Sequence, residues 1–208
     1  MRDDRARLGQ RIGLHESECL ALIDWADRHG KLLPLDYTQQ FRRVSEGAEH
    51  KVFIDLPNNR AIKSTLPSKF GHSPYGEGYA ATPLEYLERL AWHNSLFGDD
   101  IRLVGVIHEE SHVEVVSSQP WIKGCVPYMR PTQPEIEAYF AAFGFRHVPL
   151  NPDAPLFFSV ELNLIVADAH DQNVIRDQAG RLCVIDVVIG IPGPKLRRQI
   201  NDCLANSI

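Results

Sequence analysis

The stretch Val166-Ala-Asp-Ala-His-Asp-Gln-Asn-Val-Ile175, followed by Val184-Ile-Asp186, decides how the rest of the chain is interpreted. It places Asp168, Asn173 and Asp186 at successive offsets of five and thirteen residues. An apolar, strand-like run precedes the first aspartate, and another precedes the last. Carboxylate and amide oxygens are the hard ligands that suit Mg²⁺. Asn173 and Asp186 offer oxygen atoms of this kind, and Asp168 lies in the loop before them.

Two further motifs lie upstream. Ala61-Ile62-Lys63 ends a strand-like segment, and Gly47 lies in a turn ahead of Val52. A single glycine in a turn usually has no role beyond forming the turn. A lysine at a strand end is usually a surface residue whose aliphatic stem packs on apolar neighbours. The ordered set of all five residues is much harder to obtain by chance than any one of them alone. Its members are Gly47, Lys63, Asp168, Asn173 and Asp186.

This ordered set resembles the protein-kinase-like fold, and it implies an α+β fold of two lobes. The resemblance implies that Lys63 holds the phosphates of ATP and that Asp168 orients or deprotonates the attacking hydroxyl. It also implies that Asn173 and Asp186 bind Mg²⁺. Of the family's glycine-rich pattern G-x-G-x-x-G-x-V, this chain matches only the middle glycine, as Gly47, and the valine, as Val52.

The catalytic-loop segment also points to one branch of this fold. Asp168-Ala-His-Asp-Gln-Asn173 matches the D-x-H-x-x-N portion of the aminoglycoside phosphotransferase loop, and it is closer to that than to the protein-kinase H-R-D form. As a whole, the chain looks most like the small kinase domains of polyvalent proteins from phages and mobile elements. The acceptor stays open: a protein or a small molecule.

The resemblance implies a single kinase-like domain in three parts: an N-terminal helical extension at 1–37, an N-lobe with an antiparallel sheet at 38–118, and a reduced C-lobe at 119–208. Helical spacing predicts a helix from Glu16 to His29 that stops at Gly30. Capping-box patterns predict helices at 82–97 and 132–143. Val- and Ile-rich runs predict strands at 41–44, 51–55, 60–64, 101–108, 112–118, 174–175 and 182–185, and further strands within 156–166.

Three expectations concern the nucleotide. The family's N-lobe helix offers a glutamate to the strand lysine. We expect Glu88 to do so, with Glu85 as the alternative, because Glu85 is placed to cap its own helix. The hinge is expected at 118–121, where the backbone of Ser118 and Gln119 would hydrogen-bond adenine. The Gly- and Pro-rich segment 65–81 is a long loop of the kind that forms lids or binding loops, or only a surface loop.

Composition narrows the class of protein. The 208 residues carry a formal net charge of -5, which gives no general attraction to nucleic acid or anionic membrane. The charged start does not resemble a secretory signal, and no apolar run approaches the ~20 residues of a membrane span. The four cysteines share no C-x-x-C spacing. We therefore expect a cytoplasmic protein with reduced thiols.

Departures from the family keep two alternatives open. Val187-Val188 stands where protein kinases have Phe-Gly, and the 22 residues after Asp186 leave no room for an activation segment. A pseudokinase that serves as a nucleotide-binding or protein-interaction module is therefore an alternative to an ATP-dependent enzyme. A metallohydrolase that uses Asp168, His170, Asp171 and Asp186 is another, although no paired Cys/His spacing supports it. The complete Lys, Asp, Asn and Asp set favours the phosphotransferase.

Overall fold

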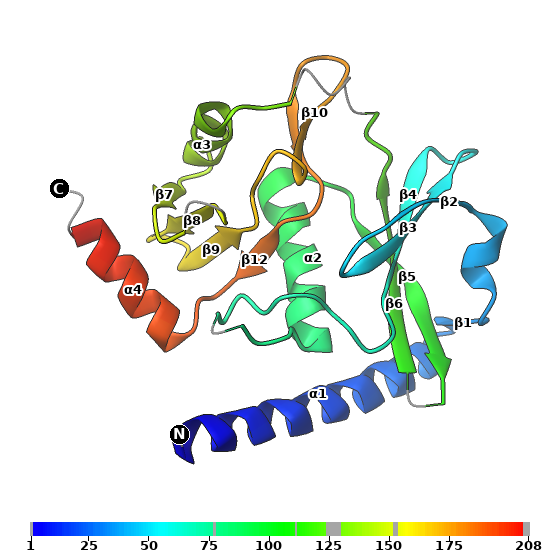
Figure 1. Cartoon of the computed structure of the whole chain (residues 1–208). Helices are drawn as coiled ribbons and strands as arrows, with labels where there is room; N and C mark the ends of the chain where they lie inside the picture. The colour runs from blue at the N-terminus through cyan, green and yellow to red at the C-terminus, as the bar shows by residue number, and fades with distance from the viewer. Residues whose placement is uncertain (1, 77, 111, 124–129, 152–153, 206–208) are drawn as a thin grey trace. The chain divides into compact units, whose positions relative to one another are not determined.

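The computed structural model describes residues 2–76, 78–110, 112–123, 130–151 and 154–205, and the side chains from residue 8 onward (Figure 1). These residues form two compact units. Unit 1 contains the described residues of 1–71, 80–87 and 100–121, and unit 2 contains those of 72–79, 88–99 and 122–208. Helix α2 (Pro83–Phe97) contributes its first turn to unit 1 and its remainder to unit 2. In the described residues the fold class is α+β, as expected.

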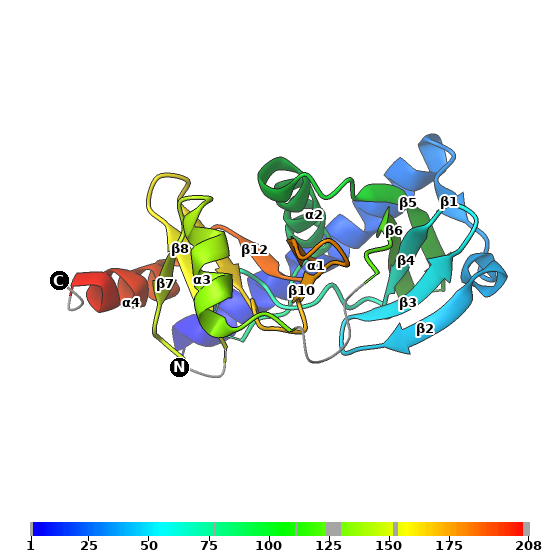
Figure 2. The same ribbon diagram turned by 90° about the horizontal axis from the view of Figure 1, so that it is seen from above.

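Unit 1 is built on a six-stranded sheet in the order β1-β5-β6-β4-β3-β2. Its neighbours pair antiparallel, except that β1 runs parallel to β5. Figure 2 shows β2, β3 and β4 lying side by side. Five strands of this sheet were predicted, and all five are present with bounds shifted by a few residues. They are β2 (Arg42–Glu46), β3 (His50–Asp55), β4 (Arg60–Thr65), β5 (Arg102–Glu109) and β6 (His112–Pro120). The sixth strand, β1 (Leu32–Leu33), was not predicted.

One face of this sheet carries the apolar core of unit 1. Phe53, Ile62, Ile107 and Val116 are buried there and pack with partly buried neighbours that include Tyr37. Tyr37 belongs to the short 3-10 helix η1 (Tyr37–Gln40). Since side chains alternate along a strand, Val52 and Lys63 lie on the opposite face.

Helix α1 (Arg2–Arg28) ends as predicted but begins much earlier. Gly30 adopts a φ of 62°, and the Lys31 amide donates to the Ala26 carbonyl at 2.7 Å, a C-terminal closure that favours glycine. The predicted start at Glu16 was wrong. Tertiary contacts support the first turns, since the Arg11 guanidinium binds the Glu85 carboxylate (2.8 Å) and the Ala80 carbonyl (2.9 Å).

Both predicted capping boxes are confirmed. At the start of α2, the Thr82 amide donates to the Glu85 carboxylate at 3.0 Å, and the Glu85 amide donates to the Thr82 hydroxyl at 3.3 Å. At the start of α3 (Gln133–Ala141), the amide and hydroxyl of Thr132 both donate to the Glu135 carboxylate, at 2.8 and 2.9 Å. These side chains satisfy backbone groups that a helix end leaves unpaired.

Unit 2 contains an antiparallel four-stranded sheet in the order β12-β9-β8-β7 and a separate β10–β11 hairpin. Phe140, Phe157, Val166 and Ile189 are fully buried in its main core, against which Phe97 of α2 packs. A second cluster lies under α4 (Pro194–Ala205). The strands are β7 (Arg146–Val148), β8 (Leu156–Ser159), β9 (Leu164–Ala167), β10 (Val174–Arg176), β11 (Leu182–Val184) and β12 (Val188–Gly190).

The second half of the predicted long loop packs within unit 2. The Gly193 amide donates to the Tyr75 carbonyl at 3.0 Å, and a Cβ on Gly190 would lie 2.4 Å from the Pro74 ring. Pro74 and Tyr75 are therefore anchored beside the end of β12, and a role of the loop as a lid stays a prediction. Among the described residues, no helix is both long enough and apolar enough to cross a membrane.

We predict opposite effects for two glycine-to-alanine changes in unit 1. A Cβ on Gly105 would lie 2.3 Å from the Lys31 carbonyl oxygen, so Gly105→Ala must displace β1 and should lower the free energy of unfolding by roughly 1–3 kcal/mol. Gly13 has nothing within 4 Å of an added Cβ and lies inside α1, so Gly13→Ala should raise it by about 0.5–1 kcal/mol. Urea unfolding measures both, and a neutral Gly105→Ala would contradict the docking of β1.

Candidate active site

Unit 1 carries the residues predicted to contact nucleotide. Gly47 lies in the turn between β2 and β3, where its amide donates to the His50 carbonyl at 2.9 Å. Val52 pairs directly with Lys63, and Lys63 pairs with Ser117 in β6. Directly opposed residues of antiparallel strands share a face, so the side chains of Val52, Lys63 and Ser117 form a row across three strands. The row has an apolar member at one end and a half-buried lysine at its centre.

Part of the expected hinge lies inside β6. Ser118 pairs with Ile62, and Gln119 pairs with Ala61. The Ser118 carbonyl accepts a hydrogen bond from the Arg60 guanidinium at 3.0 Å. The strand therefore continues through Pro120, two residues beyond the predicted end at Ser118. Contact of Ser118 and Gln119 with adenine stays a prediction.

The two glutamates of α2 have different surroundings. Glu85 serves the capping box and pairs with Arg11, with 21% of its side chain exposed. Glu88 is exposed on the helix surface. The preference against Glu85 thus has a structural basis, because its carboxylate is committed to its own helix start and to α1. Pairing of Glu88 with Lys63 stays a prediction.

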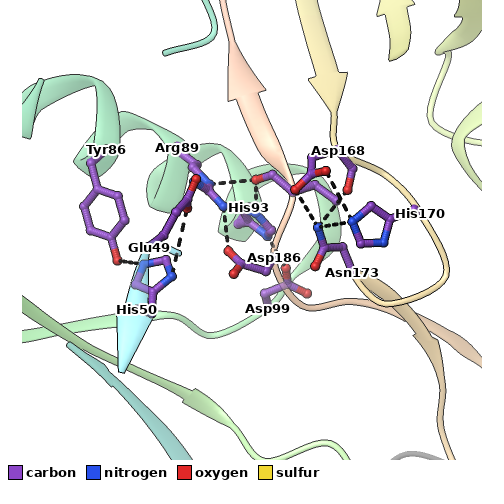
Figure 3. A network of polar contacts seen from close by, with 11 residues as sticks. Glu49, His50, Tyr86, Arg89, His93, Asp99, Asp168, His170, Asn173 and Asp186 are labelled. Atoms are coloured by element: carbon purple, nitrogen blue, oxygen red, sulfur yellow. Dashed lines mark hydrogen bonds and ion pairs between the residues drawn. The ribbon is translucent and has the colours of Figure 1, made fainter. Parts of the chain in front are cut away.

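In unit 2, Asp168 and Asn173 come together at the end of β9 (Figure 3). The Asn173 side-chain amide donates to both the carbonyl and the carboxylate of Asp168, each at 2.8 Å. The His170 ring nitrogen Nε2 lies 3.3 Å from the Asp168 carboxylate. The carbonyl of His170 accepts from the amides of Asn173 and Val174, both at 2.9 Å. The loop is therefore closed by its own polar groups, and Asp168 keeps half of its side chain exposed (51%).

Pairing of β9 with β12 brings Asp186 to this loop. Ala167 pairs with Val188, so the residue after β9 and the residue before β12 are neighbours. The Ile185 amide also donates to the Asn173 carbonyl at 2.8 Å. Asp168, Asn173 and Asp186 thus belong to one part of unit 2. Because the Asn173 amide nitrogen is used by Asp168, its oxygen is the atom suited to a metal, and with the Asp186 carboxylate this donor set fits Mg²⁺.

Sequence reasoning missed two buried polar residues of α2 that bind the segment at Asp186 (Figure 3). The Arg89 guanidinium donates to the Asp186 carboxylate at 2.5 Å and to the Val187 carbonyl at 2.7 Å. His93 Nε2 lies 3.1 Å from the same carbonyl, and its Nδ1 lies 2.8 Å from the Asp99 carboxylate. Only 5% of the Arg89 side chain and 2% of the His93 side chain are exposed.

A signal for these residues was present in the sequence. Tyr86, Arg89, His93 and Phe97 recur at offsets of three and four, which is the spacing of one helix face. Tyr86 and His93 are both almost fully buried, so this is the core face of α2. A charged residue at a core position requires a buried partner. If this face had been identified as buried, the pattern would have predicted an acidic partner for Arg89, although not which one.

The donor set of the metallohydrolase alternative is only partly assembled. Asp168 and His170 are in contact, but the Asp171 carboxylate pairs with the Arg130 guanidinium at 3.2 Å. Asp186 is paired with Arg89. The pairing of Asp171 with Arg130 therefore counts against the metallohydrolase set, whereas Asp186 belongs to both proposed sites and does not distinguish them.

The β10–β11 hairpin that separates Asn173 from Asp186 is closed by Asp177. The Asp177 carboxylate accepts from the backbone amides of Arg181 and Ala179, each at 2.9 Å, and from the Arg181 side chain. The Arg181 amide, more than any other group, holds the pKa of Asp177 below its usual value of 3.8. This turn therefore depends on the ionised carboxylate.

We predict a pH-dependent loss of stability in Asp177→Asn. A carboxyl whose pKa is depressed by folding stabilises the native state above its unfolded pKa, and that contribution is lost as the pH falls through the folded pKa. The variant should therefore melt below the wild type at pH 7, and the difference should shrink as the pH is lowered below about 4. Thermal unfolding over pH 2.5–7 measures this, and a gap that is independent of pH would contradict the electrostatic origin.

Comparison with protein families agrees with this arrangement. The model of a family described as Serine/Threonine/Tyrosine Kinase found in polyvalent proteins matches residues 15–192. No curated protein matches the chain. The matched region includes the Gly47 turn, Lys63, the Asp168 loop and Asp186. The chain therefore belongs to the family of kinases found in polyvalent proteins.

Proposed function

We propose that this chain is a minimal phosphotransferase that transfers phosphate from Mg·ATP to a hydroxyl acceptor. The observation that carries the proposal is the closed loop of unit 2, in which Asn173 binds Asp168 at 2.8 Å beside the strand that follows Asp186. Phosphoryl transfer asks a protein chiefly for positioning and charge neutralisation, and a loop closed by its own hydrogen bonds suits that task.

Each residue has a distinct proposed role. Asp168 accepts the proton of the acceptor hydroxyl, with its carboxylate oriented by Asn173 and His170. Asn173 and Asp186 hold Mg²⁺, which would neutralise the phosphate charge. Lys63 holds the phosphates as a point charge. The remaining nucleotide contacts are assigned to Gly47, Val52, Ser118 and Gln119.

One observation supports a second candidate, a nucleotide-binding or protein-interaction module without transfer activity. The carboxylate of Asp186, the charged member of the metal pair, is occupied by the guanidinium of Arg89 at 2.5 Å. A site held permanently in this state would bind magnesium poorly. Transfer activity and Mg·ATP binding distinguish the two candidates.

We predict that two isosteric changes separate the metal side from the acceptor side. A ligand at a hundredfold excess over its Kd stabilises the native state by about 2.7 kcal/mol, which is a melting shift of roughly 5–10 °C for a chain of this size. Asp186→Asn should lose most of the magnesium-dependent shift with ATP. Asp168→Asn should keep the shift and lose phosphate transfer.

The matched control is Asp171→Asn, a change in the same loop at a carboxylate that pairs with Arg130. It should alter neither the shift nor the transfer. The measurements are thermal unfolding with and without Mg·ATP and release of labelled phosphate. No shift in the wild type would favour the module without activity, and equal effects of Asp168→Asn and Asp186→Asn would refute the assigned roles.

We predict that the two α2 glutamates differ in kind. Glu85→Ala removes a cap and the Arg11 ion pair, so it should lower the free energy of unfolding by about 1 kcal/mol. Glu88→Ala changes an exposed position, so stability should stay within about 0.5 kcal/mol, while transfer falls more than ATP binding because Lys63 loses its partner. Unchanged transfer in Glu88→Ala would remove Glu88 from the site.

A further inference from the structure

Arg89 is built into the molecule as a partner of Asp186. It lies on the core face of α2, its side chain is 5% exposed, and two of its nitrogens are used at once. Nε donates to the Val187 carbonyl at 2.7 Å, and Nη2 donates to the Asp186 carboxylate at 2.5 Å. Binding through both Nε and Nη2 fixes the plane of a guanidinium, so its charge is directed at the carboxylate.

The charge of this contact opposes a metal ion. Of the two proposed magnesium ligands, Asn173 is neutral and Asp186 carries the single negative charge. With the positive charge of Arg89 beside Asp186, the summed charge of Asn173, Asp186 and Arg89 is zero. Since the affinity of an oxygen site for a divalent cation depends on the charge of its ligands, a neutralised site should bind weakly.

The Val187 carbonyl has a second donor. His93 Nε2 lies 3.1 Å from it, one helical turn beyond Arg89. If the guanidinium leaves, that buried carbonyl keeps a hydrogen bond, so release of Arg89 does not leave it unsatisfied. The 33% exposure of the Asp186 side chain also allows water or an ion to reach it.

We propose that Arg89 is an internal counter-cation that competes with divalent metal for Asp186, so that the metal binds only when Asp186 leaves Arg89. This proposal rests on the assignment of Asp186 as a metal ligand. It makes α2 a regulatory element of the site. A movement of this helix that withdraws Arg89 raises metal affinity, and metal binding in turn weakens the hold of α2 on the Asp186–Val187 segment.

The test measures Mn²⁺ binding to the whole chain, with Mn²⁺ as the probe for Mg²⁺ and the signal of the unbound ion followed by electron paramagnetic resonance. Arg89→Met removes the charge and keeps the length of the side chain. Arg89→Gln also removes the charge but keeps a hydrogen-bond donor, and it serves if the methionine variant does not fold. Both should lower the Kd for Mn²⁺ by about tenfold or more, because a unit charge in contact with a partly exposed carboxylate is worth a factor of that order.

The matched control is Arg176→Met. Arg176 resembles Arg89, since it donates to the Glu135 carboxylate at 2.6 Å and to the Gly180 carbonyl at 3.0 Å, but neither partner is a proposed metal ligand. This variant removes the same charge and should leave the Kd unchanged. Adding Asp186→Asn to Arg89→Met should abolish the gain, which assigns it to Asp186.

Each outcome decides the proposal. Tighter Mn²⁺ binding in the Arg89 variants, lost again with Asp186→Asn, supports it. An unchanged Kd would show that Arg89 does not compete, and a higher Kd would show that Arg89 orients Asp186 for the metal; both overturn it. If Mg·ATP stabilises the wild type while the Arg89 variants bind Mn²⁺ no better, the proposed function stands and this inference fails. If the Arg89 variants bind Mn²⁺ more tightly but Mg·ATP does not stabilise the wild type, this inference stands and the proposed function fails.

Discussion

The candidate site of unit 2 depends on the antiparallel pairing of β9 with β12. Asp168 and Asp186 are far apart in sequence, and the pairing of Ala167 with Val188 makes the ends of their strands neighbours. The pairing is anchored in the core, since Val166 and Ile189 lie opposite each other and are fully buried. Burial of each such side chain stabilises the native state by roughly 1.5–3 kcal/mol. Because the buried neighbours Val166 and Ile189 hold the two strands together, Asp168 and Asp186 are not needed for the pairing of the strands.

The ion pair of Arg89 with Asp186 adds a second constraint of a different kind. A buried charge pair seldom adds much net stability, because desolvation of the two ions offsets their attraction. Apolar residues at the same helix positions would pack against the core without that cost. The pair instead links the orientation of Asp186 to the position of α2, which apolar packing does not do. The ion pair therefore fixes the orientation of Asp186, and it stabilises the fold less than apolar residues at the same positions would.

Features set by neighbours in sequence could be predicted, and features set by distant contacts could not. Both capping boxes and the Gly30 closure were predicted because the residues that make the hydrogen bonds lie within a few positions of each other. The early start of α1 was not, because two glycines weaken that stretch and Arg11 is held by a partner 74 residues away. The short strand β12 and helix α4 were also missed, since each is defined chiefly by packing within unit 2. The role of Arg89 could not be predicted from the sequence, because its partners Asp186 and Val187 lie 97 and 98 positions further along the chain.

The geometry of the loop explains why Asn173 and Asp186 are unequal members of the proposed metal pair. Asp168 has a φ of 58°, a conformation that aspartate tolerates but that still requires support. That support comes from Asn173, whose amide nitrogen binds both the backbone and the carboxylate of Asp168 at 2.8 Å. Asn173 therefore has a structural role through its nitrogen and a proposed ligand role through its oxygen, so loss of its side chain would disturb both the proposed base, Asp168, and the proposed metal site. Among the described residues, Asp168, His170 and Asn173 make the hydrogen bonds that close the loop. We therefore expect that a change in the charge of Asp186, by Arg89 or by substitution, leaves the conformation of this loop in place.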